Sequence, residues 1–293
     1  MDSQSDARAR FAGLLGATTI DVSRREKRWL ALGEDVVAFA ADDADGWARL
    51  VAEARLLARW RATGVPVPHV LDEDAVRRVQ VRERLHGLTG EVVEPLLFGG
   101  ARPDARARLA EGAPLSAFGA RLAASYGELA ARIHASVPLV DADALALGRR
   151  ARADLDAALA KLRDDVSVPA SVIDAIVRAL PWLSVPPPAT AVIHGDLHFH
   201  NLCLADDGTI SGVFDLDEAG VDAAETDFQY VHSLGPDFVA IAVRAYGRTL
   251  DMEAIRHAHL YSAITHILWH GPGTPRHASI VAWITAAIEA LAS

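Results

Sequence analysis

One short stretch, VIHGDLHFHN at 192–201, constrains the fold of this chain more than any other part of its sequence. Ala191–Ile193 is apolar and predicts a short buried strand, and the residues after it are too rich in His, Asp and Asn for a simple surface turn. A second strand is predicted in ISGVFDLD (210–217), after the turn residues ADDG. Two short strands around a polar loop form a platform that presents side chains.

Helical patterns surround this platform. Residues 118–138 carry apolar side chains at helical spacing and end at Pro138. The apolar stripe consists of Leu122, Tyr126, Leu129 and Ile133. Further helices are predicted at about 150–164 and 168–180, and three helical stretches follow residue 237.

The first part of the chain has a different pattern. Residues 17–22, 27–32 and 34–41 alternate or run apolar and predict strands, and 47–64 predicts a helix that stops at Gly64. Residues 65–87 return to strand-like alternation and end at Gly87. We therefore predict an α+β fold of two lobes. Residues 1–86 form a small antiparallel β-sheet lobe with one helix, and residues 87–293 form a larger, mostly helical lobe.

Composition narrows the class of protein. The 293 residues suit one large domain or two small ones, and the beginning of the chain has no apolar stretch of signal-peptide type. The only cysteine, Cys203, excludes an internal disulfide and favours the cytoplasm. The formal charge of −10 argues against nucleic acid as a partner, and short, interrupted apolar runs argue against a membrane.

Acidic residues are concentrated in one part of the sequence. No Lys or Arg occurs between Arg178 and Arg244, whereas eight carboxylates occur between 206 and 227. They are Asp206, Asp207, Asp215, Asp217, Glu218, Asp222, Glu225 and Asp227. Such a segment either binds a cation or is a solvated acidic face, and the sequence leaves both interpretations open.

The polar residues follow the spacing His194-x-Asp196-x4-Asn201-x13-Asp215. This spacing is typical of a kinase catalytic loop and the metal-binding aspartate after it. Phosphoryl transfer needs an oriented hydroxyl, and Asp196 can orient it and accept its proton. Asn201 and Asp215 are hard oxygen ligands that suit Mg²⁺. His194 would brace the loop rather than react.

At these residues the chain resembles the aminoglycoside phosphotransferase and choline kinase-like family, which has the protein-kinase-like fold. The matching segment reads HGDLHFHN…VFDLDEAGVDAAETDF. Three further segments are similar to parts of that family. LAARIHA (129–135) resembles the helix end before the catalytic loop, EARLL (53–57) resembles part of the first-lobe helix, and RERLHG (82–87) resembles the hinge. The resemblance covers about residues 30–250 and implies ATP-dependent transfer of phosphate to the hydroxyl of a small molecule.

The resemblance also implies roles for single residues. Asp196 matches the catalytic base, with His194 beside it, and Asp227 matches a structural brace. Asn201 and Asp215 match the metal ligands. The residues expected to bind the nucleotide are Glu53, Glu83, Arg84, Leu85, Asn201 and Asp215. The implied cofactors are Mg²⁺ and ATP, with GTP as the alternative.

The chain departs from the family at the third strand. Family members usually have a phosphate-binding Lys or Arg there, paired with the helix glutamate, whereas this position falls near Ala38 in EDVVAFAADD. Losing one charge-assisted contact costs about 1.5–3 kcal/mol, which weakens nucleotide binding without preventing it. We expect Lys27 or Arg28 on the neighbouring strand to reach the phosphates. GLLGATT (13–19) lacks the GxGxxG pattern and is interpreted as a turn.

Other functions fit the residues less well. A metal hydrolase would use the histidines around Asp196, but no partner motif follows downstream. His266 and His270 have the i, i+4 spacing of zinc proteases, but Ile267 occupies the position of the required glutamate. Cys203 lies in apolar NLCL and predicts a buried, unreactive thiol. A kinase-like module that binds nucleotide without transfer remains the competing class, as does a kinase of choline, homoserine or a sugar.

The acceptor is the least determined part of the function. Asp217, Glu218 and Asp222 follow the metal ligand Asp215 and predict an acidic pocket for a cationic hydroxyl compound, such as an aminoglycoside or a basic peptide antibiotic. Such an acceptor would imply antibiotic resistance, and the sequence leaves open whether resistance is the physiological role or a side activity. The sequence leaves the oligomeric state open.

Overall fold

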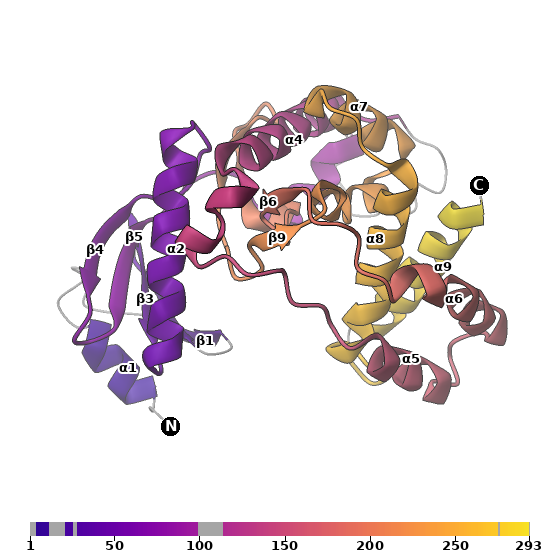
Figure 1. The fold of residues 1–293 in the computed structure, drawn as a ribbon, viewed down its shortest axis with the longest axis horizontal. Coiled ribbons are helices and arrows are strands. Elements are labelled where there is room, and N and C mark those ends of the chain that lie inside the picture. The colour runs from indigo at the N-terminus through magenta and orange to yellow at the C-terminus, as the bar shows by residue number, and fades with distance from the viewer. Residues whose placement is uncertain (1–3, 12–20, 26–27, 99–113, 275, 293) are drawn as a thin grey trace.

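The computed structural model describes residues 4–11, 21–25, 28–98, 114–274 and 276–292. They form a small lobe that contains a β-sheet and a larger helical lobe beside it, with the N-terminal end on the first and the C-terminal end on the second (Figure 1). No helix of these residues is long and apolar enough to cross a membrane.

The described residues of the small lobe form a five-stranded antiparallel sheet in the order β1-β2-β3-β5-β4. Its strands are β1 (Asp21–Arg25), β2 (Arg28–Leu32), β3 (Val36–Ala41), β4 (Val70–Asp74) and β5 (Val79–Glu83). Side chains alternate between the two faces of a strand. On β3, Ala38 and Ala40 pack with Phe11 of α1 (Gln4–Phe11), and Val37 and Phe39 therefore face the other lobe.

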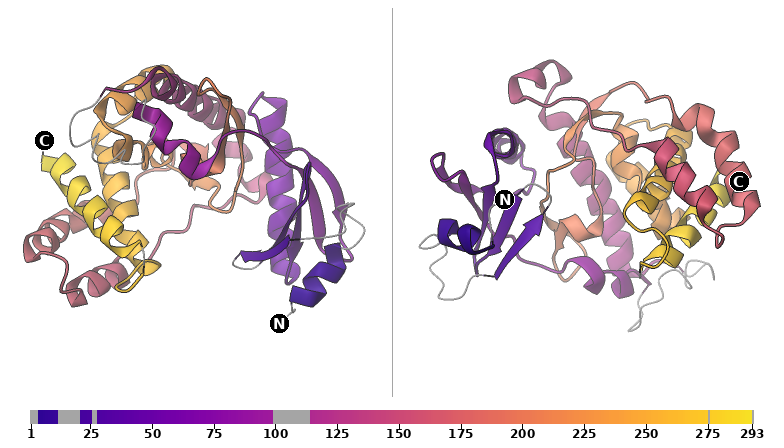
Figure 2. Two further views of the ribbon diagram at one scale, coloured as in Figure 1. Left: turned by 180° about the vertical axis from the view of Figure 1, so that it is seen from behind. Right: turned by 90° about the horizontal axis from the view of Figure 1, so that it is seen from below.

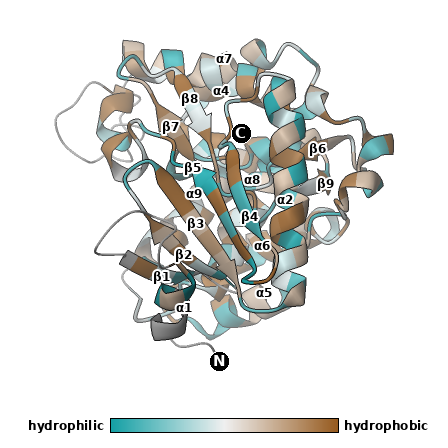
Figure 3. Cartoon of the chain, turned by 90° about the vertical axis from the view of Figure 1, so that its left-hand side faces the viewer, coloured by the Kyte–Doolittle hydropathy of each residue, from teal (hydrophilic) through white to brown (hydrophobic). Residues whose placement is uncertain are grey.

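Helix α2 (Ala44–Ala62) packs against β3 and β4 of the sheet and contributes side chains to a core of the helical lobe. Asp43 caps its start by accepting a hydrogen bond from the Gly46 backbone N–H at 2.7 Å, and Gly64 follows its end with φ of +80°. Leu57 and Trp60 belong to the same buried cluster as the helical lobe. Each such side chain contributes about 1.5–3 kcal/mol on burial. Figure 3 shows this helix with alternating apolar and polar patches, next to β4 in that view.

The helical lobe has two hydrophobic cores. The first packs α4 (Ala117–Ser136) against α7 (Pro236–Tyr246), and it includes the strands near the catalytic-loop motif. The second joins four helices, which lie together at the end of the molecule away from the sheet (Figure 2). These are α5 (Leu155–Asp164), α6 (Ala170–Leu183), α8 (Met252–Thr265) and α9 (His277–Ala292).

Short strands hold the polar loop predicted from the sequence. β6 (Ala191–Ile193) pairs with β9 (Gly220–Asp222), and β7 (Leu202–Leu204) pairs with β8 (Ile210–Val213), all antiparallel. The chain enters this lobe just after β5, where Leu88 forms a β-bridge with Leu204. Residues 194–201 are therefore fixed at both ends by paired strands.

The α+β, two-lobed fold predicted from the sequence is confirmed, with local differences. The small lobe contains a second helix, α1, which the sequence analysis did not predict. The helix predicted from 150 begins only at Leu155, because Asp154 caps it. The strand predicted over 210–217 ends at Val213, since Asp215 has φ of +64°, and it pairs with β7, a strand that the sequence analysis did not predict. The strand prediction at 17–20, Lys27 and GLLGATT (13–19) lie outside the described residues.

Candidate active site

Asp227 fixes the backbone that follows β6. It lies in the 3-10 segment η6 (Ala224–Phe228) and is fully buried. Its carboxylate accepts hydrogen bonds from the backbone N–H groups of His194 at 3.0 Å and Gly195 at 2.7 Å, and His134 Nε2 lies 2.9 Å away. Burial opposes ionisation, but His134, through its hydrogen bond and charge, keeps the pKa of Asp227 below its ordinary value. The loop is thus held by a buried carboxylate.

His194 connects the loop to its surroundings. Its ring is buried, with Nε2 3.0 Å from the carbonyl of Phe214 and Nδ1 3.3 Å from the backbone nitrogen of Asp196. The ring also stacks on Trp60 of α2 at a centroid distance of 6.1 Å. Both ring nitrogens are engaged with backbone groups, which is the arrangement of a bracing residue.

Asp196 lies at the end of this braced segment. Its carboxylate accepts hydrogen bonds from Asn201 Nδ2 at 2.8 Å and from the Tyr230 hydroxyl at 2.7 Å, and His198 Nε2 is 3.5 Å away. Burial alone would raise the pKa of Asp196, but His198 and Tyr230 hold it well below its ordinary value. The carboxylate is therefore ionised at neutral pH, as an acceptor for a hydroxyl proton must be.

Asn201 and Asp215 meet at one end of the β7–β8 hairpin. The backbone N–H of Phe214 donates to the carbonyl of Asn201 at 3.0 Å, so the two candidate metal ligands flank this bond. Asn201 donates through Nδ2 to Asp196, which leaves its Oδ1 available to a cation. Among the described residues no three His, Cys, Asp or Glu side chains gather as a metal site. An amide and one carboxylate fit Mg²⁺, which takes its remaining oxygens from phosphate and water.

A cleft of about 390 Å³ lies between the sheet and the hairpin. The predicted hinge residues Glu83, Arg84 and Leu85 form one wall, and Asp215 lies at another. Arg84 donates its backbone N–H to Asp35, whereas the backbone of Leu85 makes no hydrogen bond within the described part of the chain. The peptide groups of Leu85 are thus available to a planar heterocycle. Cys203 lines the cleft as a buried thiol whose pKa is raised by burial, as predicted.

Glu53 holds two arginines beside this cleft. It accepts hydrogen bonds from Arg28 Nη1 at 2.8 Å and Arg82 Nη2 at 2.7 Å. Burial opposes ionisation of Glu53, but Arg82 and Arg28 lower its pKa. Both guanidinium carbons lie over the ring of Phe39, at 4.8 Å for Arg28 and 4.5 Å for Arg82. The two arginines come from β2 and β5, on either side of β3.

The sequence analysis placed the missing phosphate-binding Lys or Arg of β3 near Ala38, and the structure moves that position by one residue. Ala38, which the sequence analysis placed near it, is fully buried on the side of the sheet that packs against α1. Phe39 is the β3 residue that lines the cleft. Arg28, one of the two residues expected to replace the missing cation, also contacts Asp217 and lies 3.6 Å from Asp215.

The three acidic residues assigned to the acceptor are divided between two cavities of the described residues: Asp217 and Glu218 line one, and Asp222 lines another. Asp217 is paired with Arg28, and Glu218 lies 3.2 Å from Arg150 Nε. Asp222 is 3% exposed, and its carboxylate accepts the backbone N–H of Ala223. Sequence spacing brought these residues close along the chain, but the fold directs them to different partners.

A larger cavity of about 700 Å³ opens on the other side of the catalytic loop. It is lined by four histidines, several aromatic rings, Arg276 and one carboxylate, Glu94. The rings nearest Asp196 are His198, Tyr230, His266 and Trp283, in mutual edge or tilted contacts. Sequence reasoning missed Tyr230 and Trp283, because nothing in their local pattern distinguishes them from core residues. His266 was predicted as a groove-lining or packed residue, and it lines this cavity.

A two-lobed fold with a nucleotide-sized cleft, a braced aspartate and paired oxygen ligands defines a kinase-like phosphotransferase. The family model described as "Phosphotransferase enzyme family" matches residues 33–258. The chain therefore belongs to the phosphotransferase enzyme family, and the predicted resemblance is confirmed.

Solved structures agree with this fold. A macrolide 2'-phosphotransferase type I has 21% identity and a TM-score of 0.63, covering 100% of this chain and 98% of that one. The GDP complex of aminoglycoside 2'-phosphotransferase-IIIa has 16% identity and a TM-score of 0.64, covering 99% and 98%. The macrolide 2'-phosphotransferase MphH from Brachybacterium faecium has 19% identity and a TM-score of 0.60, covering 98% of each chain. No curated protein sequence matches this chain.

Proposed function

We propose that this enzyme transfers the γ-phosphoryl group of ATP, or of GTP, to a hydroxyl of a small molecule. The observation that carries the proposal is the position of Asp196. Its carboxylate is hydrogen-bonded to Asn201, beside the cleft, and to Tyr230, which lines the second cavity. A nucleotide in the cleft and a hydroxyl compound in the cavity would meet at this group.

The chemical step follows from this arrangement. The acceptor hydroxyl donates its proton to Asp196 as its oxygen bonds to the γ-phosphorus. The bond from phosphorus to the β,γ-bridging oxygen breaks, and its electron pair leaves with the nucleoside diphosphate. The pKa of Asp196 is held below its ordinary value, so its carboxylate is ionised and can accept this proton.

Asn201 Oδ1 and Asp215 would hold Mg²⁺, which when bound neutralises phosphate charge. Arg28 would supply the cation that β3 lacks. It is anchored by Glu53, and its guanidinium lies between Glu53 and Asp215. A phosphate oxygen can replace Asp215 or Asp217 as its partner when nucleotide and metal enter.

The acceptor is proposed to be a hydroxyl compound with a cationic amine and a large apolar surface. The cavity beside Asp196 offers Glu94 and the faces of Tyr230 and Trp283 to such a cation. The paired carboxylates Asp217 and Glu218 would contribute less, since each already has an arginine.

The test of transfer compares the protein with Asp196→Asn. The enzyme is supported if nucleoside diphosphate is released only when a hydroxyl compound is added. Asp196→Asn should then lower the rate of release at least about 100-fold while nucleotide binding is unchanged. Tight ATP binding without transfer to any acceptor would favour the kinase-like binding module.

The test of the acceptor site compares Glu94→Gln with the double variant Asp217→Asn, Glu218→Gln, using any cationic acceptor found in that screen. Glu94→Gln is expected to raise the acceptor KM about tenfold, the loss of one charged contact, and the double variant to raise it less. If the double variant instead raises the acceptor KM more than Glu94→Gln does, the result would favour the acidic pocket predicted from the sequence.

A further inference from the structure

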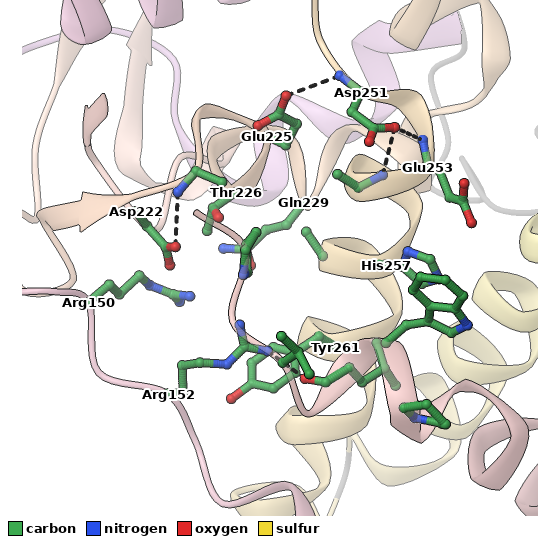
Figure 4. Close-up of a pocket in the computed structure, with 18 residues that line it drawn as sticks. Arg150, Arg152, Asp222, Glu225, Thr226, Gln229, Asp251, Glu253, His257 and Tyr261 are labelled. Carbon is green, nitrogen blue, oxygen red and sulfur yellow. Dashed lines mark hydrogen bonds between the residues drawn. The ribbon is translucent and has the colours of Figure 1, made fainter. Parts of the chain in front are cut away.

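A separate cavity of about 400 Å³ lies on the helical lobe, between the end of α6, the start of α8 and the segment that follows β9. None of its lining residues lines the nucleotide cleft or the cavity beside Asp196. Figure 4 shows this cavity, with Arg150 and Arg152 entering it from the same extended segment. It is therefore distinct from the nucleotide cleft and from the cavity beside Asp196, although Asp222, one of the residues predicted to bind the acceptor, lines it.

Arg150 and Arg152 bring two guanidinium groups into this confined space, and within the described part of the chain only Arg150 has an ion pair. Arg150 Nε is buried and lies 3.2 Å from the Glu218 carboxylate, close enough for an ion pair but without the geometry of a hydrogen bond, and the Glu218 side chain is 48% exposed. Arg152 donates one Nη to the carbonyl of Leu183 at 2.8 Å and lies over the ring of Tyr261 at 4.1 Å. No described carboxylate lies within ion-pair distance of Arg152. Two guanidinium groups with so little compensation attract an anion.

The rest of the wall is mostly apolar. Trp182 stacks on His257 at a centroid distance of 5.9 Å and an interplanar angle of 13°. Apolar contact surface is added by Pro181, Leu183, Val185, Pro187, Ala254 and Ala258. A ring or branched chain can be buried here beside the charged wall.

The carboxylates on the far side are engaged with backbone groups. Glu225 accepts the N–H of Asp251 at 3.0 Å, and Asp251 accepts the N–H groups of Glu253 and Ala254 at the start of α8. Figure 4 shows Glu225, Asp251 and Glu253 on the side away from Arg150 and Arg152. Asp222 lies beside Arg150, and its carboxylate accepts the backbone N–H of Ala223 and pairs with Arg149. An anionic group is consequently directed to the arginine wall.

We propose that this cavity binds a small organic anion, with a carboxylate or phosphate on Arg150 and Arg152 and an aromatic or branched body against the apolar wall. The proposal is independent of phosphoryl transfer. The two guanidinium groups supply the charge-assisted hydrogen bonds, and the apolar wall distinguishes such a molecule from a simple inorganic ion.

Calorimetric titrations test the proposal with phenylacetate and phenyl phosphate as probes, acetate as the anion without a ring, and benzyl alcohol as the ring without a charge. Phenylacetate or phenyl phosphate is expected to bind at about millimolar affinity. Acetate and benzyl alcohol are each expected to bind at least about tenfold more weakly. The stronger of the two probes identifies a carboxylate or a phosphate as the preferred group.

Variants assign the binding to this cavity. Arg150→Ala and Arg152→Ala should each weaken the probe at least about tenfold. Arg163→Ala is the matched control, since Arg163 on α5 is exposed and does not line the cavity. Should Arg152→Ala lower the melting temperature, Arg152→Met keeps the packing on Tyr261. Any of three results would overturn the proposal. They are unchanged affinity in both cavity variants, binding of acetate as tight as that of phenylacetate, and no binding of either probe.

Discussion

Replacing Arg28 with alanine tests how this chain manages without a cation on β3. The Arg28 side chain is 12% exposed and joins Glu53, Asp217 and Asp215. The substitution removes the one guanidinium that lies next to both the helix glutamate and the candidate metal ligand. It leaves Glu53 paired with Arg82 at 2.7 Å.

The expected magnitude follows from these contacts. A lost charge-assisted bond to phosphate costs about 1.5–3 kcal/mol, which corresponds to a rise of roughly 10- to 100-fold in the KM for ATP. Because Arg82 still neutralises Glu53, the loss of stability should be about 1–2 kcal/mol, less than the roughly 3–5 kcal/mol of a broken lone buried pair. Asp215 loses a competing cation, so Mg²⁺ should bind no more weakly than before.

The assay is nucleoside diphosphate release at varied ATP and Mg²⁺, with the melting temperature as a measure of folding. Arg24→Ala is the control, because Arg24 pairs with Asp42 and its side chain is 41% exposed. Arg28→Lys should recover part of the affinity. An unchanged KM for ATP in Arg28→Ala would refute the assignment of Arg28 to the phosphates.

Four further predictions follow from single residues. Asp215→Asn should abolish Mg²⁺-dependent nucleotide binding in calorimetry, while metal-independent binding of adenosine persists. Ala38→Lys should unfold the small lobe, because it buries a charge against α1; Phe39→Lys should fold with a lower melting temperature, since the lysine meets two arginines. The pKa of Asp227 is lower in the folded protein than in the unfolded chain, so its ionised carboxylate stabilises the fold. This contribution is complete above the ordinary aspartate pKa of about 3.9, and it is lost as the pH falls from there toward the pKa of the folded state. Melting curves between about pH 2 and 5 should show a larger loss in the wild type than in Asp227→Asn, because other carboxylates with lowered pKa values remain in the variant. Cys203 should react with a disulfide reagent near pH 8 far more slowly than free cysteine, since the thiol is buried and its pKa is raised; equal rates would contradict that environment.

The sequence alone predicted the two lobes and the catalytic loop. Apolar periodicity separates a strand-rich beginning from a helical remainder, and this depends only on local spacing. The spacing from His194 to Asp215 predicted the active site because those residues are placed by short, contiguous strands. Asp227, predicted as a brace, holds the loop through its own carboxylate.

Tertiary structure decided which residues act together. The identity of the β3 residue that faces the cleft depends on the register of the sheet, and a shift of one residue exchanges Ala38 for Phe39. Arg28, Glu53 and Arg82 come from three elements, and only their packing shows that two arginines flank one glutamate. The carboxylates at 217, 218 and 222 are close in sequence, yet each has a different partner. A local pattern fixes which side chains a loop presents, whereas their charge environment depends on residues distant in the chain.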